Sequence, residues 1–409
     1  MVTEPLLGVI IRRVTTRGVN RIVELVKPHW KRGPAGQPTP PELFLLLYRL
    51  WLIAFTFKVL GASWDVSWHF RWLRDDLAPP HLLNSVGTVI VVALVIMHGY
   101  TGLGVDRGAL RLIQWGTGVF LIAVPLDLIN HRINGLDITS WSPSHSLLYI
   151  GTALMIAGIL RAWHLGAPQT RYRPLVFGAL WVFFLENVWF PAQHQEYGVL
   201  EIASWDRGDP YAEPILLEFA AQQIGRPVDR EAVVAFSLPT PDWVYPMWTA
   251  VVGVLVLVLA RRTVGWRWTA TAVAGTYLGY RCLIWPLLVG TNFPASAVPF
   301  FVLASGLAVD LVFLIRLKPL VRAVVGAVVV TGVTYAALAA QTLLLVAPPS
   351  SYPSGVVAAV LLAALWWGGE RLVSGDWWNR WQGTEPARGS TSESTPENTS
   401  APAAEATGS

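Results

Sequence analysis

Long apolar runs separated by short polar connections occupy most of this chain from residue 43 onward. Each run is long enough, as a helix, to cross about 30 Å of hydrocarbon, and the glycines and prolines within several of them are tolerated in membrane helices. The pattern predicts an all-α, polytopic transmembrane bundle of about ten spans. The expected spans are residues 43–63, 82–103, 110–130, 146–164, 173–190, 244–260, 268–290, 298–315, 321–346 and 355–373.

Basic residues cluster on alternate connections between these runs, which predicts the orientation of the bundle. Arginine and lysine are enriched on the cytoplasmic side of membrane proteins. If all ten runs cross, both termini lie inside (N-in, C-in), and these residues share that side: Arg12 to Arg32, Arg107, Arg111, Arg161, Arg171, Arg173, Arg261, Arg262, Arg267, Arg316, Lys318, Arg322, Arg371 and Arg380.

Composition supports a membrane protein and excludes other classes. The chain is 53% hydrophobic and 14% charged, whereas a soluble domain is about a quarter charged. Its 21 tryptophans suit two interfacial aromatic belts. A formal charge of +4 is too small to indicate nucleic acid as a partner, and the single cysteine, Cys282, excludes an internal disulfide and a cysteine-rich metal cluster.

A polar motif occurs twice within the first four runs. Each copy reads D-x3-H, a loop, a proline, and then H-x-L-x-x-[VI]-G-T. The chemistry-bearing residues are Asp65, His69 and His81, here called the first ligand set, and Asp127, His131 and His145, the second ligand set. Residues four apart share one helix face, and the second histidine of each set begins the following span. Both sets are therefore predicted at the same depth, on the outer side.

An aspartate with two neutral histidines suits a divalent transition metal with open coordination positions. Copper, iron and zinc all fit these ligand types. For a single D-x3-H at a helix end, a hydrogen-bonded interfacial pair is the favoured interpretation, since ionisable residues are tolerated there. The repetition, with a proline and a histidine following in both copies, favours metal binding.

With these motifs, residues 43–200 resemble the copper-binding membrane subunit of particulate methane and ammonia monooxygenases. In that family an Asp-His-His set and an Asn-His-His set lie near one another in transmembrane helices. The resemblance implies copper, oxygen-dependent hydroxylation of an apolar substrate, and work in a complex with other subunits. The gap to His81 is slightly shorter than in the family, and Asp127 stands where the family has asparagine. The last five spans lie outside the resemblance.

Further polar residues fall within or beside apolar runs. Glu186, with Asn187 and His194, forms a third polar cluster near the outer end of the fifth span. Two interpretations are open for this cluster. It is either functional, as an additional ligand or a proton carrier, or only a helix end that meets an acidic loop. Arg281 and Asp310 lie inside apolar runs and are expected to pair with each other. A structural role is expected for His29, His98 and His164.

These features divide the chain into five parts. We expect a basic amphipathic arm and linker (1–41), a metal-site half of duplicated hairpins (42–190), an extracytoplasmic acidic loop (191–243) with a short helix at 214–224, a C-terminal helical half (244–373) and a disordered tail (374–409). The loop has nine acidic residues against three basic ones.

Three functions are compatible with the sequence. The favoured one is a copper-dependent, monooxygenase-like oxidoreductase in a bacterial plasma membrane, acting on an apolar small molecule or lipid, with Glu186 ordering a ligand or moving protons. The second is a protein that transports or binds copper or another divalent metal without catalysis. In the third, the metal only stabilises the hairpins. We expect partner subunits or a homo-oligomer in the first case, and no nucleic acid.

Overall fold

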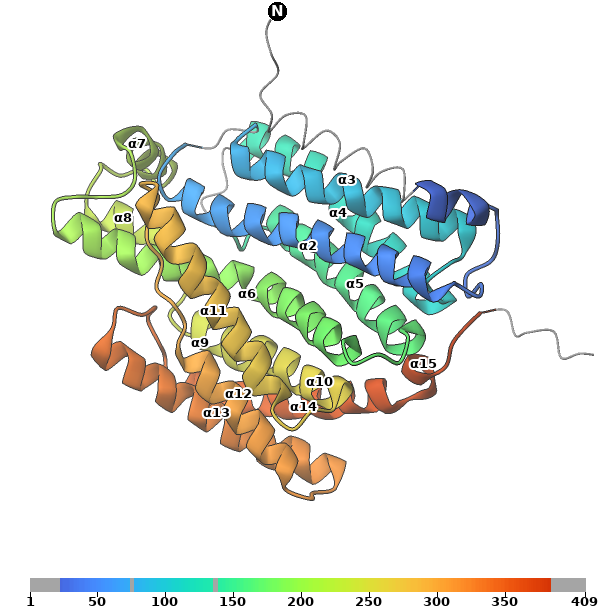
Figure 1. The fold of residues 1–409 in the computed structure, drawn as a ribbon. Helices are drawn as coiled ribbons and strands as arrows, with labels where there is room; N and C mark the ends of the chain where they lie inside the picture. The colour runs from blue at the N-terminus through green and yellow to red at the C-terminus, as the bar shows by residue number, and fades with distance from the viewer. Residues whose placement is uncertain (1–22, 74–76, 135–138, 384–409) are drawn as a thin grey trace, which may run out of the picture.

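The computed structural model describes residues 23–73, 77–134 and 139–383, and these residues form a bundle of long helices (Figure 1). This confirms the all-α helical bundle. The amphipathic arm expected over residues 1–22 and the tail beyond residue 383 lie outside the described residues.

The first four long helices form two antiparallel hairpins, one for each copy of the motif. Helices α2 (Pro41–His69) and α3 (Pro79–Thr101) make the first hairpin, and α4 (Arg107–Asn134) and α5 (Pro143–Gly166) make the second. Three of the four begin with a proline in the first turn, where the missing N–H would be unsatisfied in any case.

Small residues at matching positions hold the helices of each hairpin together. A Cβ at Gly87 would lie 2.7 Å from the Ala54 carbonyl oxygen, and one at Gly151 would lie 2.8 Å from the Gly116 carbonyl oxygen. Ala54 and Gly116 each stand eleven residues before the aspartate of their copy. Within each hairpin the helices therefore make the same close contact, so the duplication extends from sequence to packing.

Helix α6 (Arg173–Asp206) packs against both hairpins and against the C-terminal helices (Figure 1). The sequence placed its end at residue 190 and assigned 191–243 to a loop, and this boundary is wrong. The helix continues through Pro191, whose lack of an N–H removes only one backbone hydrogen bond. Residues 191–199 are all buried, because α8 and neighbouring helices cover this part of α6.

The C-terminal half contributes the remaining long helices. One span, Val244–Val264, consists of α9 (Val244–Trp248), a π-helical turn (Thr249–Gly253) and α10 (Val254–Val264). It is followed by α11 (Thr269–Gly290), α12 (Phe301–Leu314), α13 (Pro319–Leu344), α14 (Ser354–Ser374) and the short α15 (Asp376–Asn379).

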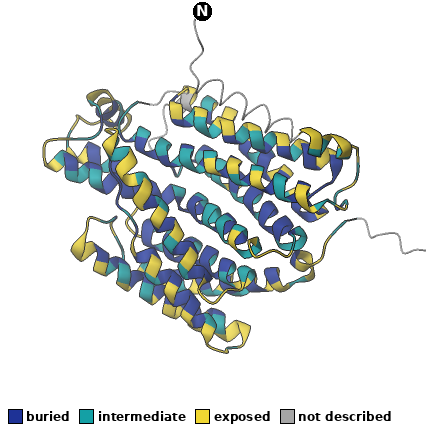
Figure 2. Ribbon diagram, viewed as in Figure 1, coloured by how far each residue is buried: buried dark blue, intermediate teal, exposed yellow. Residues whose placement is uncertain are grey.

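Nine helices of the described residues are long and apolar enough to cross a membrane. The remaining predicted span, 298–315, the eighth along the chain, is a shorter apolar helix, α12, of 14 residues. Exposed residues lie along the outside of the bundle (Figure 2). On α3 and α13 they include large apolar residues such as Val89 and Val328. Apolar surface of this kind on long helices is suited to lipid. The chain is an integral membrane protein with many spans.

The expected ion pair between Arg281 and Asp310 is wrong. Asp310 pairs with Arg261 at 3.1 Å and accepts hydrogen bonds from the first backbone N–H groups of α11, including that of Thr271 at 2.8 Å. Arg281 lies ten residues further along α11, roughly 15 Å away along the axis, and pairs with Glu196 at 2.8 Å. The two charges lie at different depths in the bundle.

The predicted disordered tail begins too early at residue 374. Residues 376–379 form α15, and Trp378 is buried. The Arg161 guanidinium, paired with Asp106 at 2.6 Å, donates to the Trp377 carbonyl oxygen and, at 3.1 Å, to that of Arg380. This buried arginine anchors the chain as far as the described part extends.

Two short helices form a cap, residues 207–243, over the end of the bundle where α2 terminates. They are α7 (Pro214–Gln223), which confirms the short helix expected there, and α8 (Arg230–Ser237), which the sequence did not predict. Asp229 begins α8 by accepting a hydrogen bond from the Ala232 N–H at 2.8 Å. This bond, together with Arg226, holds the pKa of Asp229 below its usual value.

Candidate metal centre

The first ligand set meets where α2 ends and α3 begins. Asp65 and His69 lie in the last turns of α2, and His81 lies in the first turn of α3. Asp65 Oδ1 is 2.8 Å from His81 Nε2 and 3.5 Å from His69 Nε2. Because one atom from each residue lies within 4.8 Å of the others, the three side chains predicted from the sequence do converge.

One of these distances is near the separation expected of metal ligands. Tetrahedral ligands about 2.0–2.1 Å from one metal ion lie roughly 3.3 Å apart. The distance between Asp65 and His69 is close to that value, whereas the 2.8 Å between Asp65 and His81 is the length of a hydrogen bond. The side chains of Asp65, His69 and His81 are 21–31% exposed. A ligand exchanged from outside can therefore reach this set.

A glycine brings the two helices close enough for this convergence. A Cβ at Gly61, one turn before Asp65, would lie 2.8 Å from the backbone nitrogen of Asn84 on α3. Any larger residue at this position separates α2 from α3 just beneath the ligand set. The D-x3-H spacing supplies the shared face, and Gly61 supplies the close approach.

The second ligand set is brought together in part. Asp127 Oδ1 and His145 Nε2 lie 3.9 Å apart. His131 is one turn beyond Asp127 on α4, but its side chain lies outside the described residues. Its part in the set stays a prediction.

The orientation of His145 favours a cation at its Nε2 atom. Its Nδ1 lies 3.1 Å from the carbonyl oxygen of Thr139 and 3.0 Å from Ser142 Oγ. A carbonyl oxygen only accepts, so Nδ1 carries the hydrogen for that bond, and Nε2 of the neutral ring presents a lone pair toward the Asp127 carboxylate. Two electron-rich atoms facing one another favour a proton or a metal ion between them. Fixing Nδ1 in this way is the usual arrangement of a metal-binding histidine.

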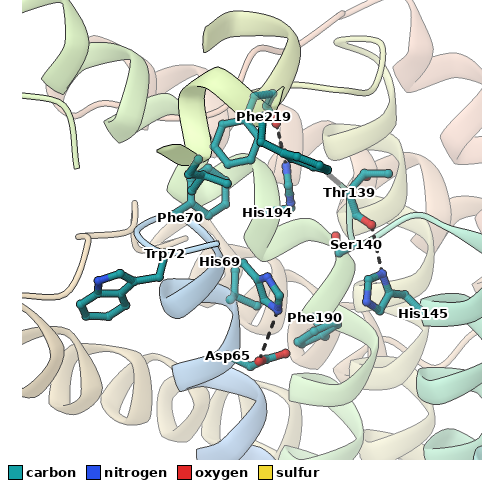
Figure 3. Close-up of a pocket in the computed structure, with 13 residues that line it drawn as sticks. Asp65, His69, Phe70, Trp72, Thr139, Ser140, His145, Phe190, His194 and Phe219 are labelled. Atoms are coloured by element: carbon teal, nitrogen blue, oxygen red, sulfur yellow. Dashed lines mark hydrogen bonds and ion pairs between the residues drawn. The ribbon is translucent and has the colours of Figure 1, made fainter. Parts of the chain in front are cut away.

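Part of each set lines a single cavity, here called the histidine pocket, whereas His81 and Asp127 do not line it. Asp65 and His69 from α2 line it together with His145 from α5, and His194 from α6 lines it as well (Figure 3). The cavity has a volume of about 50 Å³, enough for a few water molecules or a small molecule. Most of its remaining wall is apolar: Val66, Phe70, Trp72, Phe190, Leu216, Phe219 and Phe236.

The cap covers one side of the histidine pocket. Phe219 on α7 and Phe236 on α8 form part of its wall, and His194 Nε2 lies 3.2 Å from the Phe236 carbonyl oxygen. Gly198, one turn beyond His194, allows α8 to dock, since a Cβ there would collide with the Ser237 carbonyl oxygen.

Replacing Gly198 with alanine is expected to displace α8. Overpacking of this kind costs about 1–3 kcal/mol, so we expect limited proteolysis within residues 207–243 to speed up by roughly tenfold or more. Gly178→Ala, on the same helix with open space around the new Cβ, serves as the control. Equal cleavage rates in the two variants would contradict this account of the cap.

Glu186 lies beneath the histidine pocket and does not line it. Its side chain is buried, and its Oε1 accepts hydrogen bonds from Ser63 Oγ at 3.0 Å and Gln193 Nε2 at 2.8 Å. Phe190, one turn further along α6, does line the pocket. Asn187 points elsewhere and donates to the Tyr149 carbonyl oxygen. This placement suits a proton carrier better than a metal ligand.

Lys58 is a buried cation that the sequence reasoning missed. Its Nζ donates to Asn84 Oδ1 at 3.0 Å and to Thr88 Oγ1 at 3.3 Å, and it lies 3.6 Å from the centre of the Phe120 ring. Lys58 and Phe120 each stand seven residues before the aspartate of their copy, so equivalent positions of the two hairpins contact each other. A lysine inside an apolar run was the available signal.

Glu196 is a second missed residue. It is fully buried on α6 and pairs with Arg281. The sequence placed it in the extracytoplasmic acidic loop, because the fifth apolar run was taken to end at residue 190. Nothing local in the sequence distinguishes it from the other acidic residues between 191 and 243.

Comparison with known proteins leaves the resemblance untested. The chain matches no protein-family model, no curated protein and no solved structure. Its function is therefore inferred from the geometry of the chain itself.

Proposed function

We propose that this membrane protein binds metal at its two ligand sets, with copper as the ion, and acts as a monooxygenase-like oxidoreductase. The observation that carries the proposal is convergence: Asp65 and His69 of one copy and His145 of the other line one pocket. Their ligand types suit a first-row transition metal, and the resemblance to the monooxygenase family favours copper over iron or zinc.

Each group of residues has a distinct role in this proposal. The aspartates and histidines of the two ligand sets hold the metal, and the backbone carbonyl of Thr139 orients His145. When bound, copper would supply one-electron redox chemistry with dioxygen. The aromatic wall and the cap residues that line the pocket favour an apolar reactant. Glu186, one turn below Phe190, supplies protons.

The pocket restricts the substrate. A volume of about 50 Å³ admits a small apolar molecule or the reacting end of a lipid, but not a whole lipid. The surrounding phenylalanine side chains favour a hydrocarbon group over a charged one. Partner subunits or a homo-oligomer follow from the resemblance alone.

Two assays on one copper-loaded preparation test this function. The purified protein is expected to bind copper and, with a chemical reductant, to consume oxygen above the rate of a copper-matched buffer. Reconstituted vesicles should accumulate no copper. Uptake without oxygen consumption would instead indicate a transport protein, and neither activity with copper still bound would indicate a structural metal.

A further inference from the structure

A cluster of two carboxyl groups and one guanidinium group lies inside the bundle, separate from the ligand sets. Glu186 and Glu196 on α6 and Arg281 on α11 form this buried acid cluster, and each is at most 4% exposed. Arg281 and Glu196 are the charged groups of the described residues that act on Glu186. Tyr280, on α11, also faces it through Ser63, with 2.6 Å between their hydroxyl oxygens.

Glu196 has the contacts of an ionised carboxylate. Its Oε2 is 2.8 Å from Arg281 Nη1, and its Oε1 accepts from Trp189 Nε1 at 2.8 Å and from the Tyr245 hydroxyl at 2.9 Å. Oε1 therefore accepts two hydrogen bonds, and Oε2 lies at ion-pair distance from the guanidinium, which supplies the opposite charge. Charge-assisted contacts of this kind stabilise the anion.

Glu186 has the contacts of a neutral carboxylic acid. Both of its hydrogen bonds reach Oε1, while Oε2 is shielded from solvent and has no hydrogen-bond partner among the described residues. Arg281 balances one negative charge, and Glu196 already supplies it. A second ionised carboxylate would leave an unbalanced buried charge, which costs several kcal/mol. A proton on Oε2 removes that cost.

A small polar cavity adjoins the buried acid cluster. Its volume of about 10 Å³ matches roughly one water molecule. Ser63 and Gln193, the two partners of Glu186, line it together with Arg281, and its other polar lining residues are Tyr197, Trp285 and Ser296. A water molecule held here would find several hydrogen-bond partners.

We propose that the carboxyl group of Glu186 stores a proton. This proton is delivered to the histidine pocket and is replaced through the water-sized cavity. The O–H bond at Oε2 breaks, its electron pair stays on the carboxylate, and the proton passes to a basic oxygen in the pocket. Phe190, at the pocket wall, is four residues or about 6 Å further along the helix axis. A proton from the outside solution, relayed by the water in the cavity, then restores the O–H bond, and the cavity water is left unchanged. Delivery to the pocket rests on the proposed function, but the charge state of the cluster does not.

Infrared difference spectroscopy tests which carboxyl group of the buried acid cluster is protonated and which is ionised. Replacing Glu186 with glutamine is expected to remove one carbonyl band of a protonated carboxyl group. Glu196→Gln is expected to remove the same band, because Glu186 must then ionise to balance Arg281. Arg281→Met is expected to add a second such band. The infrared bands of other buried acids, such as Glu201, are the same in each variant and cancel in the difference spectra.

Two outcomes would overturn the proposal. If Glu186→Gln leaves the protonated-carboxyl region unchanged, Glu186 is ionised and stores no proton. If the band survives in Glu196→Gln, Glu186 does not share charge with the Arg281 pair. The glutamine variants keep the size of each side chain, so each folded variant can be compared directly with the folded native protein.

Copper content and oxygen consumption separate this proposal from the proposed function. Glu186→Gln is expected to bind copper as the native protein does, with oxygen consumption lowered by about 100-fold or more, the usual effect of losing a proton donor. Loss of the infrared band at an unchanged rate would contradict delivery to the pocket. If the native protein shows the band but binds no copper, the proposed function fails while the stored proton stands.

Discussion

Replacing His69 and His81 together with alanine is expected to abolish metal binding at the first ligand set. Both Nε2 atoms lie within 3.5 Å of one Asp65 oxygen, so the variant leaves a single carboxylate. Losing a partner that only orients a ligand already costs 10–100-fold in metal affinity, and losing two ligands should exceed 100-fold. Elemental analysis and metal titration of the purified variant measure the loss.

The control for this variant is His164→Ala. His164 lies at the opposite end of α5 from His145, where its Nε2 contacts Asn379 Oδ1 at 3.2 Å. We expect native metal content in this variant, because both ligand sets stay intact. Native metal content in the His69/His81 variant as well would refute the first ligand set and would leave the Asp65 cluster as a hydrogen-bonded helix end.

Replacing Gly151 with valine is expected to have the second large effect, because it turns a close contact between α4 and α5 into a steric clash. A Cβ at this position would lie 2.8 Å from both the Gly116 carbonyl oxygen and the Phe120 backbone nitrogen. These are backbone atoms, so α4 and α5 must separate. We expect a cost near the upper end of the 1–3 kcal/mol range for overpacking, seen as a lower thermal unfolding midpoint in detergent.

Separation of α4 and α5 also reaches the second ligand set. His145 lies six residues before Gly151 on α5, and its partner Asp127 lies on α4. Metal bound by this pair should therefore fall together with stability. Gly118→Val is the control, because a Cβ at Gly118 meets no atom within 4 Å. If both valine variants behave alike, close packing at Gly151 is not what positions His145.

The two copies of the motif share a framework but differ in their deeper contacts. Gly87 and Gly151 make equivalent contacts within their hairpins, yet Lys58 in the first copy corresponds to Phe120 in the second. The buried ammonium group is stabilised by Asn84, Thr88 and the face of the Phe120 ring. Lys58 and Phe120 thus fill the space between the two hairpins, about two helical turns below Asp65 and Asp127.

By itself the sequence determined the features that arise from local spacing. Apolar runs of sufficient length located the helices, since each had to satisfy its own backbone within lipid. The i, i+4 spacing of Asp65 and His69, followed by a short connection to His81, determined the first ligand set, because residues so close along the chain have few other arrangements.

Only the tertiary structure decided the contacts between distant segments. Helix α6 continued past Pro191 because packing buried the residues that follow, and this turned Glu196 from an expected loop residue into the partner of Arg281. The common pocket, its cap and the buried acid cluster likewise join residues from helices far apart in the chain. Their energies come from burial and charge pairing across helices, which no local pattern of residues records.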